Sequence, residues 1–400
     1  MKYIALQRTV GEQKLVESRW HELGSEELDY PELKSIYSPG NLLEYLLHPL
    51  EDNDDGDNKD VNGEASIWDQ ARVSLSTKDM SELREMFASC NYLGNALPHD
   101  FLSPLECERY EREELGNMIF ETNDVIAARE FLKSGCPHSL RRHFWSLVLG
   151  IEAAEKVQEE FEKLKKRAIK YEFFIDQIMF KDNCSTVCND EEYFVFQDIV
   201  CEIIVAFIRD TYVAKRCNNG GKGTNSAASV AACAIVPFYG FAMYVGPLCF
   251  MYTDVPELYA VFREMYCRYF HKLSSISSHP QSILSLMLTF ERLLQCREPD
   301  LLAALASKNI TLLPAAIKLL MGCFTGSLPV EEVFEVWDRI LAYDSLHIIP
   351  VLAAAIIYST REAIMKVENQ TALEDLISGL SCTGGPVVPM LLKFLDIEHQ

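Results

Sequence analysis

Positive charge is scarce in this 400-residue sequence. It contains 37 lysines and arginines against 59 aspartates and glutamates, so its formal net charge at pH 7 is −22. A field of that sign repels nucleic acid and anionic lipid, which argues against nonspecific binding to either. The basic stretch at residues 163–167 is short and is interpreted as a solvated helix face. No nucleic-acid partner and no direct membrane insertion are therefore predicted.

Targeting signals and paired cysteines are also missing. The first eight residues lack the apolar core of a signal peptide, and no lipidation motif is present. The thirteen cysteines are scattered without a pairing pattern, which predicts reduced thiols in a cytoplasmic protein. Cys184 and Cys188 stand four apart, but no histidine cluster or second cysteine pair accompanies them. The sequence therefore predicts no metal site and no cofactor.

One uncharged segment, residues 227–252, is long enough to cross a membrane. Its first third is rich in alanine and serine, and prolines and glycines interrupt the remainder, so a buried core segment is predicted instead. The preceding run, residues 218–226, is rich in glycine and contains a lysine. Its Gly-Lys-Gly-Thr order does not fit a phosphate-binding loop and no strand precedes it, so a flexible surface loop is predicted.

The sequence has the composition of a soluble globular protein, with 48% hydrophobic and 24% charged residues. From residue 124 onward apolar positions recur at helical spacing, with Gly, Pro or Ser in the connections and no β-α-β alternation. This pattern predicts an all-α fold. The predicted helices span 124–134, 139–150, 152–180, 191–210, 240–252, 256–273, 280–296, 299–306, 312–324, 330–342 and 345–364.

In the stretch from Phe194 to Thr211, the positions before Arg209 are almost wholly apolar over a length that fits a buried helix, which would end at Arg209. A helix there would present a long cation from the end of a packed element. Two interpretations stay open for this arginine. It could offset the negative end of the helix dipole, or it could act on a partner.

Short patterns surround this stretch in a fixed order. The first contains Arg141 and Trp145; the second contains Ile203, Ala206 and Arg209; the third contains Tyr239 and Gly240, preceded by Pro237; and Leu328-Pro329 and Trp337-Asp338 follow. The ordered set resembles the TBC-domain family, the GTPase-activating proteins of Rab-type small GTPases. The resemblance covers about residues 131–362. It implies a two-lobed, all-α TBC domain.

Composition, helical spacing and the resemblance together predict how the chain is divided. Residues 1–50 would form a helical lead-in, 51–64 an acidic flexible linker, 65–130 a helical extension packed on the domain, 131–362 the TBC-like domain and 363–400 a helical tail. The acidic run lacks the closing glutamate of a calcium loop, so no calcium site is predicted there.

The family motifs imply roles for individual residues. Family members resemble a two-finger device, in which an arginine stabilises charge on the transferred phosphoryl group and a glutamine holds the attacking water. Here Arg209 meets the arginine position, whereas Tyr239 stands at the glutamine position. Ala206 stands where the family has an aspartate that would orient the arginine, and Glu202 or Asp210 could replace that carboxylate.

Two functions follow from this pattern. The first is a GTPase activator that acts in trans on a GTP-loaded Rab-type GTPase through Arg209. The second is a catalytically impaired TBC protein that binds the GTPase as an adaptor. In either case GTP and Mg²⁺ belong to the partner, and any membrane recruitment would come through it. Arg141, Trp145 and Trp337 are expected to pack, and Asp338 to pack or cap a helix.

Overall fold

The computed structural model describes residues 75–92, 104–170, 173–217, 231–235, 238–378 and 386–397, with the side chains of 104–110 and 378 excepted. These ranges contain helices and turns and no strand, so the all-α prediction is confirmed for them. The α-helices are α6 (Met80–Phe87), α7 (Pro104–Thr122), α8 (Val125–Leu132), α9 (His138–Leu149), α10 (Ala154–Lys170), α11 (Phe174–Ser185), α12 (Gln197–Ile208), α13 (Thr211–Cys217), α14 (Val255–Met265), α15 (His271–Leu273), α16 (Ile283–Arg297), α17 (Pro299–Ser307), α18 (Leu313–Met321), α19 (Val330–Tyr343), α20 (Ile348–Ser359), α21 (Arg361–Ile364), α22 (Gln370–Ser378) and α23 (Val387–Leu395).

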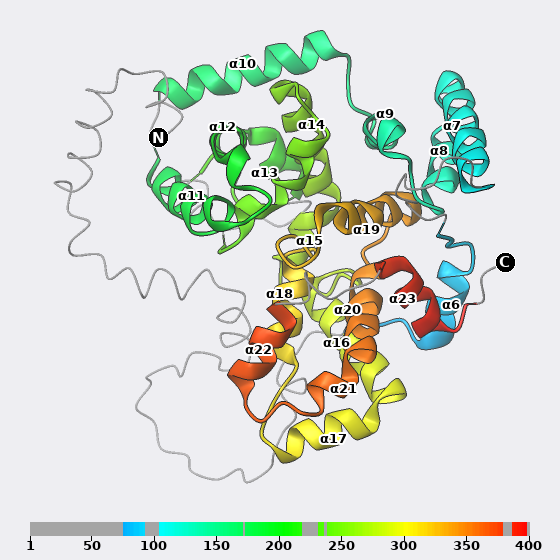
Figure 1. Cartoon of the computed structure of the whole chain (residues 1–400). Coiled ribbons are helices and arrows are strands. Elements are labelled where there is room, and N and C mark those ends of the chain that lie inside the picture. Colours follow the sequence, from blue (N-terminus) through cyan, green and yellow to red (C-terminus); the bar gives the residue numbers. More distant parts are fainter. Residues whose placement is uncertain are drawn as a thin grey trace, which may run out of the picture.

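The helices form two groups (Figure 1). One contains α10 to α14, with α7 to α9 at its side, and the other contains α16 to α18 and α20 to α23. Helix α19 lies between the groups, where it contacts α8 and α9 on one side and α20 and α23 on the other. The two-lobed arrangement expected from the resemblance is thus present, and α19 belongs to the cores of both lobes.

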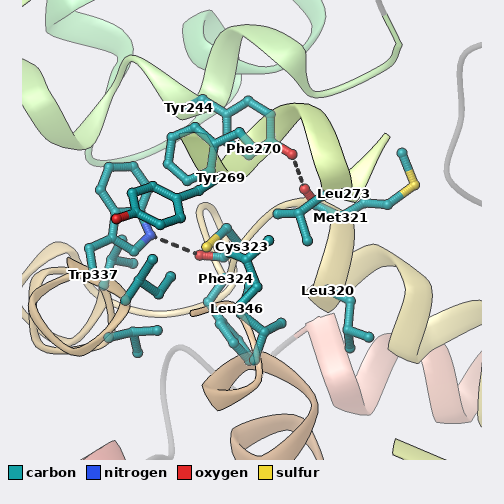
Figure 2. Close-up of a cluster of buried hydrophobic side chains, with 14 of the residues drawn as sticks. Tyr244, Tyr269, Phe270, Leu273, Leu320, Met321, Cys323, Phe324, Trp337 and Leu346 are labelled. Atoms are coloured by element: carbon teal, nitrogen blue, oxygen red, sulfur yellow. Dashed lines mark hydrogen bonds between the residues drawn. The ribbon is translucent and has the colours of Figure 1, made fainter. Parts of the chain in front are cut away.

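An aromatic cluster joins the lobes near α19 (Figure 2). The rings of Tyr244 and Phe270 stack with centroids 4.5 Å apart, and Phe270 meets the indole of Trp337 at 5.0 Å. The Tyr244 hydroxyl donates to the carbonyl of Met321, and Trp337 Nε1 donates to that of Cys323 at 3.3 Å. The polar tips of these large rings are therefore satisfied inside the core, as buried tyrosine and tryptophan require. Trp337 packs as predicted.

Several predicted helices differ from the observed ones. The stretch 152–180 is divided between α10 and α11, and 345–364 between α20 and α21. The stretch 240–252 forms two 3-10 turns, Phe241–Tyr244 and Pro247–Phe250, instead of one helix. Gly240, at a φ of +93°, and the Gly246-Pro247 pair interrupt the backbone where a regular helix would have to continue.

The uncharged segment is a core element where it is described. Nearly all its side chains from Phe241 to Tyr252 are buried, and Phe250 is the exposed exception. Among the described residues, no helix combines the length and the apolar character that a membrane span needs.

Several predictions fall on other parts of the chain. The lead-in at 1–50, the linker at 51–64, the loop at 218–226 and Pro237 all lie outside the described residues. The proposed boundaries of the extension and the tail stay predictions.

Candidate functional site

Arg209 caps the C-terminal end of α12, a helix in which eight of the twelve residues are buried. Its side chain is only 2% exposed. The guanidinium faces Asp176 of α11, with Nη1 2.5 Å from Oδ1 and Nη2 2.6 Å from Oδ2. Two parallel N–H···O bonds of this length form a bidentate, charge-assisted pair. The pair is buried on both sides, because Asp176 is also 2% exposed.

Two further contacts hold the guanidinium in place. Nη1 donates to the carbonyl of Val205, one turn back in α12, at 3.2 Å, and the ring of Phe173 lies 5.0 Å from the guanidinium carbon. The expectation of a cation presented outward from the helix end is therefore corrected. In this structure Arg209 is neutralised within its own domain, because a desolvated charge requires a partner. Its role as a finger stays a prediction.

The carboxylate that orients Arg209 is neither of the two expected from the sequence. Of the two expected candidates, Glu202 pairs with Lys165 at 3.0 Å, and Asp210 accepts a hydrogen bond from the Tyr259 hydroxyl at 2.6 Å. The carboxylate that orients the arginine instead belongs to Asp176, which lies 33 residues earlier in the chain. A signal for it exists in the sequence, since it is the single acid in the largely apolar run 173–180. Such an acid, if buried, must find a cation or a set of donors.

The third motif is hydrogen-bonded to α11, the helix that also carries Asp176. Asp182 of α11 accepts the backbone N–H groups of Gly240 at 2.7 Å and Ala242 at 2.9 Å. Burial raises the pKa of this carboxyl to about 6, and the two backbone donors act in the opposite direction. Tyr239, which the resemblance puts at the glutamine position, is half-buried, and its hydroxyl lies 3.4 Å from the Ser185 carbonyl. That hydroxyl therefore already has an acceptor within the domain.

Helix α11 thus gathers the second and third motifs. Asp176 and Asp182 lie six positions apart, which corresponds to about 9 Å along a helix axis. One acid holds the arginine and the other holds the backbone turn that carries Tyr239 and Gly240. The two segments that carry the positions expected to act together are therefore both hydrogen-bonded to α11.

The first motif packs against α19. Trp145 Nε1 donates to Asp338 at 2.6 Å, and Arg141 donates to Asp338 at 3.0–3.2 Å and to Glu335 at 2.9 Å. The backbone N–H of Cys136 adds a further bond to Asp338 at 3.1 Å. All these groups are buried. The indole and guanidinium are thus buried and paired, as expected. Asp338 lies in the middle of α19, so its expected capping role is corrected to that of a buried acceptor.

Comparison with known proteins places the chain among its relatives. The profile of the Rab-GTPase-TBC domain matches residues 238–365. The human protein TBC1 domain family member 19 is 34% identical over 407 aligned residues, which cover 98% of this chain and 76% of that protein. The chain belongs to the Rab-GTPase-TBC domain family.

Solved TBC domains share this fold. The flagellar RabGAP TBC domain of Chlamydomonas has a TM-score of 0.50 and 15% identity, covering 76% of this chain and 98% of its own. The Ypt/Rab-GAP domain of Gyp1p has a TM-score of 0.51 and 12% identity, covering 72% and 97%. At such low identity these similarities establish the architecture alone.

The two other positions of the second motif lie in the interior of this TBC domain. Ile203 and Ala206 are both buried on α12. A methyl group at position 206 cannot orient the arginine, and the carboxylate arrives from α11 instead. No cluster of three or more potential metal ligands occurs in the part of the chain that the structure describes.

Proposed function

We propose that this TBC domain binds a GTP-loaded Rab-type GTPase as an adaptor and does not supply an arginine finger. Membership of the family supports the choice of partner. The observation that carries the proposal is the buried, bidentate pair between Arg209 and Asp176. A finger has to bring uncompensated positive charge to the phosphoryl oxygens of a partner's nucleotide.

The energies favour the adaptor. Breaking a buried ion pair costs about 3–5 kcal/mol. An arginine finger accelerates hydrolysis by about 10³–10⁵-fold, which corresponds to about 4–7 kcal/mol of barrier. Withdrawing Arg209 from Asp176 would therefore consume most of what the finger could contribute.

The glutamine position supports the same conclusion. An amide holds the attacking water by accepting a hydrogen bond from it through its carbonyl, and its NH₂ group donates to the phosphate. Tyr239 has a single hydroxyl on a rigid ring, near the Ser185 carbonyl. Neither of the two fingers of the family mechanism is then ready to act. The adaptor needs no cofactor of its own, because GTP and Mg²⁺ are the partner's, and the partner would bring it from the cytoplasm to membranes.

A GTPase activator is the second candidate, and one observation favours it. Two acids of the same helix, α11, bind the arginine of the second motif and the backbone of the third, so both motifs are anchored to one element, as a two-finger mechanism would need. In this alternative a docked GTPase displaces Asp176 from Arg209, and the GTPase's own glutamine positions the water.

Two assays on one panel of Rab proteins separate these functions. Binding is measured with GTP-loaded and GDP-loaded partners, and hydrolysis is measured under single-turnover conditions. The adaptor predicts binding that prefers the GTP form, with hydrolysis at the partner's intrinsic rate. Absence of binding across the panel would remove the Rab-binding function itself.

Matched variants sharpen the hydrolysis assay. Arg209→Ala is compared with Lys215→Ala, which removes an exposed cation from the next helix, after thermal melting has established that both are folded. The adaptor predicts equal hydrolysis rates for the wild type and both variants. A wild-type acceleration of 10³-fold or more that Arg209→Ala abolishes and Lys215→Ala retains would establish the activator instead.

A further inference from the structure

The charges of α10 are divided along its length. Its acids, at positions 155, 159, 160 and 162, all precede residue 163. The segment 163–170, the basic end of α10, contains no acid and five cations: Lys163, Lys165, Lys166, Arg167 and Lys170. Lys165 pairs with Glu202 of α12 at 3.0 Å, which leaves four cations for the surface. A chain with a net charge of −22 thus carries a local region of the opposite sign.

The four remaining cations share one face of the helix. Positions 163, 166, 167 and 170 follow the i, i+3, i+4, i+7 spacing that a helix brings onto one side, and all four side chains are exposed. The face that packs on the lobe carries instead the buried residues Val157, Phe161, Leu164 and Ala168. Figure 1 shows α10 along the outer edge of its lobe. The cationic face is therefore open to a partner.

Nearby carboxylates leave most of this positive charge uncompensated. Lys163 lies 3.6 Å from Glu159, but both side chains are exposed, and such pairs contribute little. Lys166 and Arg167 form no ion pair with any residue that the structure describes. Acids elsewhere on the chain act only weakly on this face, because physiological salt screens exposed charges beyond about 8 Å.

Two exposed apolar side chains accompany the cations. Ile169, one position before Lys170, is 56% exposed, and Phe174, the first residue of α11, is 51% exposed. Phe174 follows Lys170 by four residues, so their Cα atoms lie within about 14 Å of each other. Large apolar side chains beside lysine and arginine are typical of segments that lie in the interface of an anionic membrane. An acidic protein would pair with the cations and leave the apolar side chains without a role.

We propose that the basic end of α10, together with Phe174, binds the surface of an anionic lipid bilayer. Opposite charge selects the headgroups, whose phosphate and carboxylate oxygens accept hydrogen bonds from the ammonium and guanidinium groups. Ile169 and Phe174 enter the boundary between headgroups and acyl chains. The contact is adsorption at the surface, and no helix crosses the bilayer. It requires no GTPase, so it is independent of the proposed Rab binding.

The contact would also place the candidate site near the membrane. Phe174 stands two residues before Asp176, the partner of Arg209, and the Phe173 ring lies 5.0 Å from the Arg209 guanidinium carbon. A bilayer held at Phe174 is therefore close to the second motif. Binding to the lipid and to a membrane-bound partner would reinforce each other, because the second contact then forms within one complex.

Sedimentation with lipid vesicles tests this surface in the full-length protein without a GTPase. The vesicles contain phosphatidylcholine alone or with about 30% phosphatidylserine, in about 0.1 M salt. Each cation at an anionic surface strengthens partitioning about fivefold, so three or four should favour the anionic vesicles by about 10²- to 10³-fold. Raising the salt to about 0.5 M should release the protein. Equal binding to both kinds of vesicle, or binding to neither, would overturn the proposal.

Variants at exposed positions locate the contact. Lys166→Gln combined with Arg167→Gln should weaken binding to the anionic vesicles about 25-fold. Ile169→Ser should weaken it about tenfold, because it removes a half-exposed apolar side chain from the interface. The matched control combines Lys156→Gln with Lys366→Gln, which removes the same charge from exposed positions outside the basic end, and should bind as the wild type does. Thermal melting first establishes that each variant is folded.

Two results with the double variant of the basic end would refute the assignment. Wild-type affinity for the anionic vesicles would show that other residues make the contact. Wild-type protein that is retained on immobilised polyglutamate but not on vesicles, and whose retention the double variant loses, would assign the surface to an acidic protein instead.

Discussion

Replacement of Asp176 by alanine tests the central structural claim, that this residue neutralises Arg209. Both side chains are almost fully buried, at 2% and 1% exposed, so the variant leaves a guanidinium without its counter-charge in the interior. Removal of one partner from a buried pair costs about 3–5 kcal/mol. Because a whole domain is stable by only about 5–15 kcal/mol, the loss should be large and easily measured.

Urea denaturation of a double-mutant cycle provides the magnitude. Asp176→Ala and Arg209→Ala are each expected to destabilise the protein, and the double variant should lose less than the sum by about 2 kcal/mol or more, since neither charge is then left alone. Glu159→Ala, which breaks an exposed pair with Lys163 on α10, serves as the control and should cause no measurable change. Additive losses from the two single variants would refute the reasoning, because uncoupled side chains do not form a neutralising pair.

Three further predictions concern the elements around this pair. Burial raises the pKa of Asp182 from 3.8 to about 6, so the stability that its protonation adds is complete below pH 4 and is lost as the pH rises through 6. The free energy of unfolding should therefore be about 1.4 kcal/mol larger at pH 5 than at pH 7 because of this group. Asp182→Asn should remove that difference. Asp338→Ala leaves Arg141 and the Trp145 N–H without their main acceptor and should cost about 3–5 kcal/mol in urea denaturation; a loss below 1 kcal/mol would contradict the role of Asp338 as their shared buried acceptor. Gly240→Ala should cost only about 1–2 kcal/mol by the same measurement, because its φ of +93° is left-handed while no atom lies within 4 Å of the added methyl, and a larger loss would point to a hidden clash.

The local pattern of residues was sufficient for the fold class and the family. Helical spacing of apolar residues depends on neighbours three and four positions apart, so it can be seen without knowing the tertiary structure. It predicted most helices between α8 and α20 and the burial of α12. It failed at 240–252, where an apolar run was interpreted as one helix although glycine and proline divide it into two short turns.

The state of Arg209 was decided by tertiary structure alone. The sequence places this arginine at the end of an apolar helix and leaves its counter-charge open between Glu202 and Asp210. Only the packing of α11 against α12 brings Asp176 within 2.6 Å of it. A buried charge must be compensated, but which acid compensates it depends on how distant helices meet, and that is absent from any local pattern. Asp338 shows the same limit, because its donors Arg141 and Trp145 come from a helix nearly two hundred residues earlier.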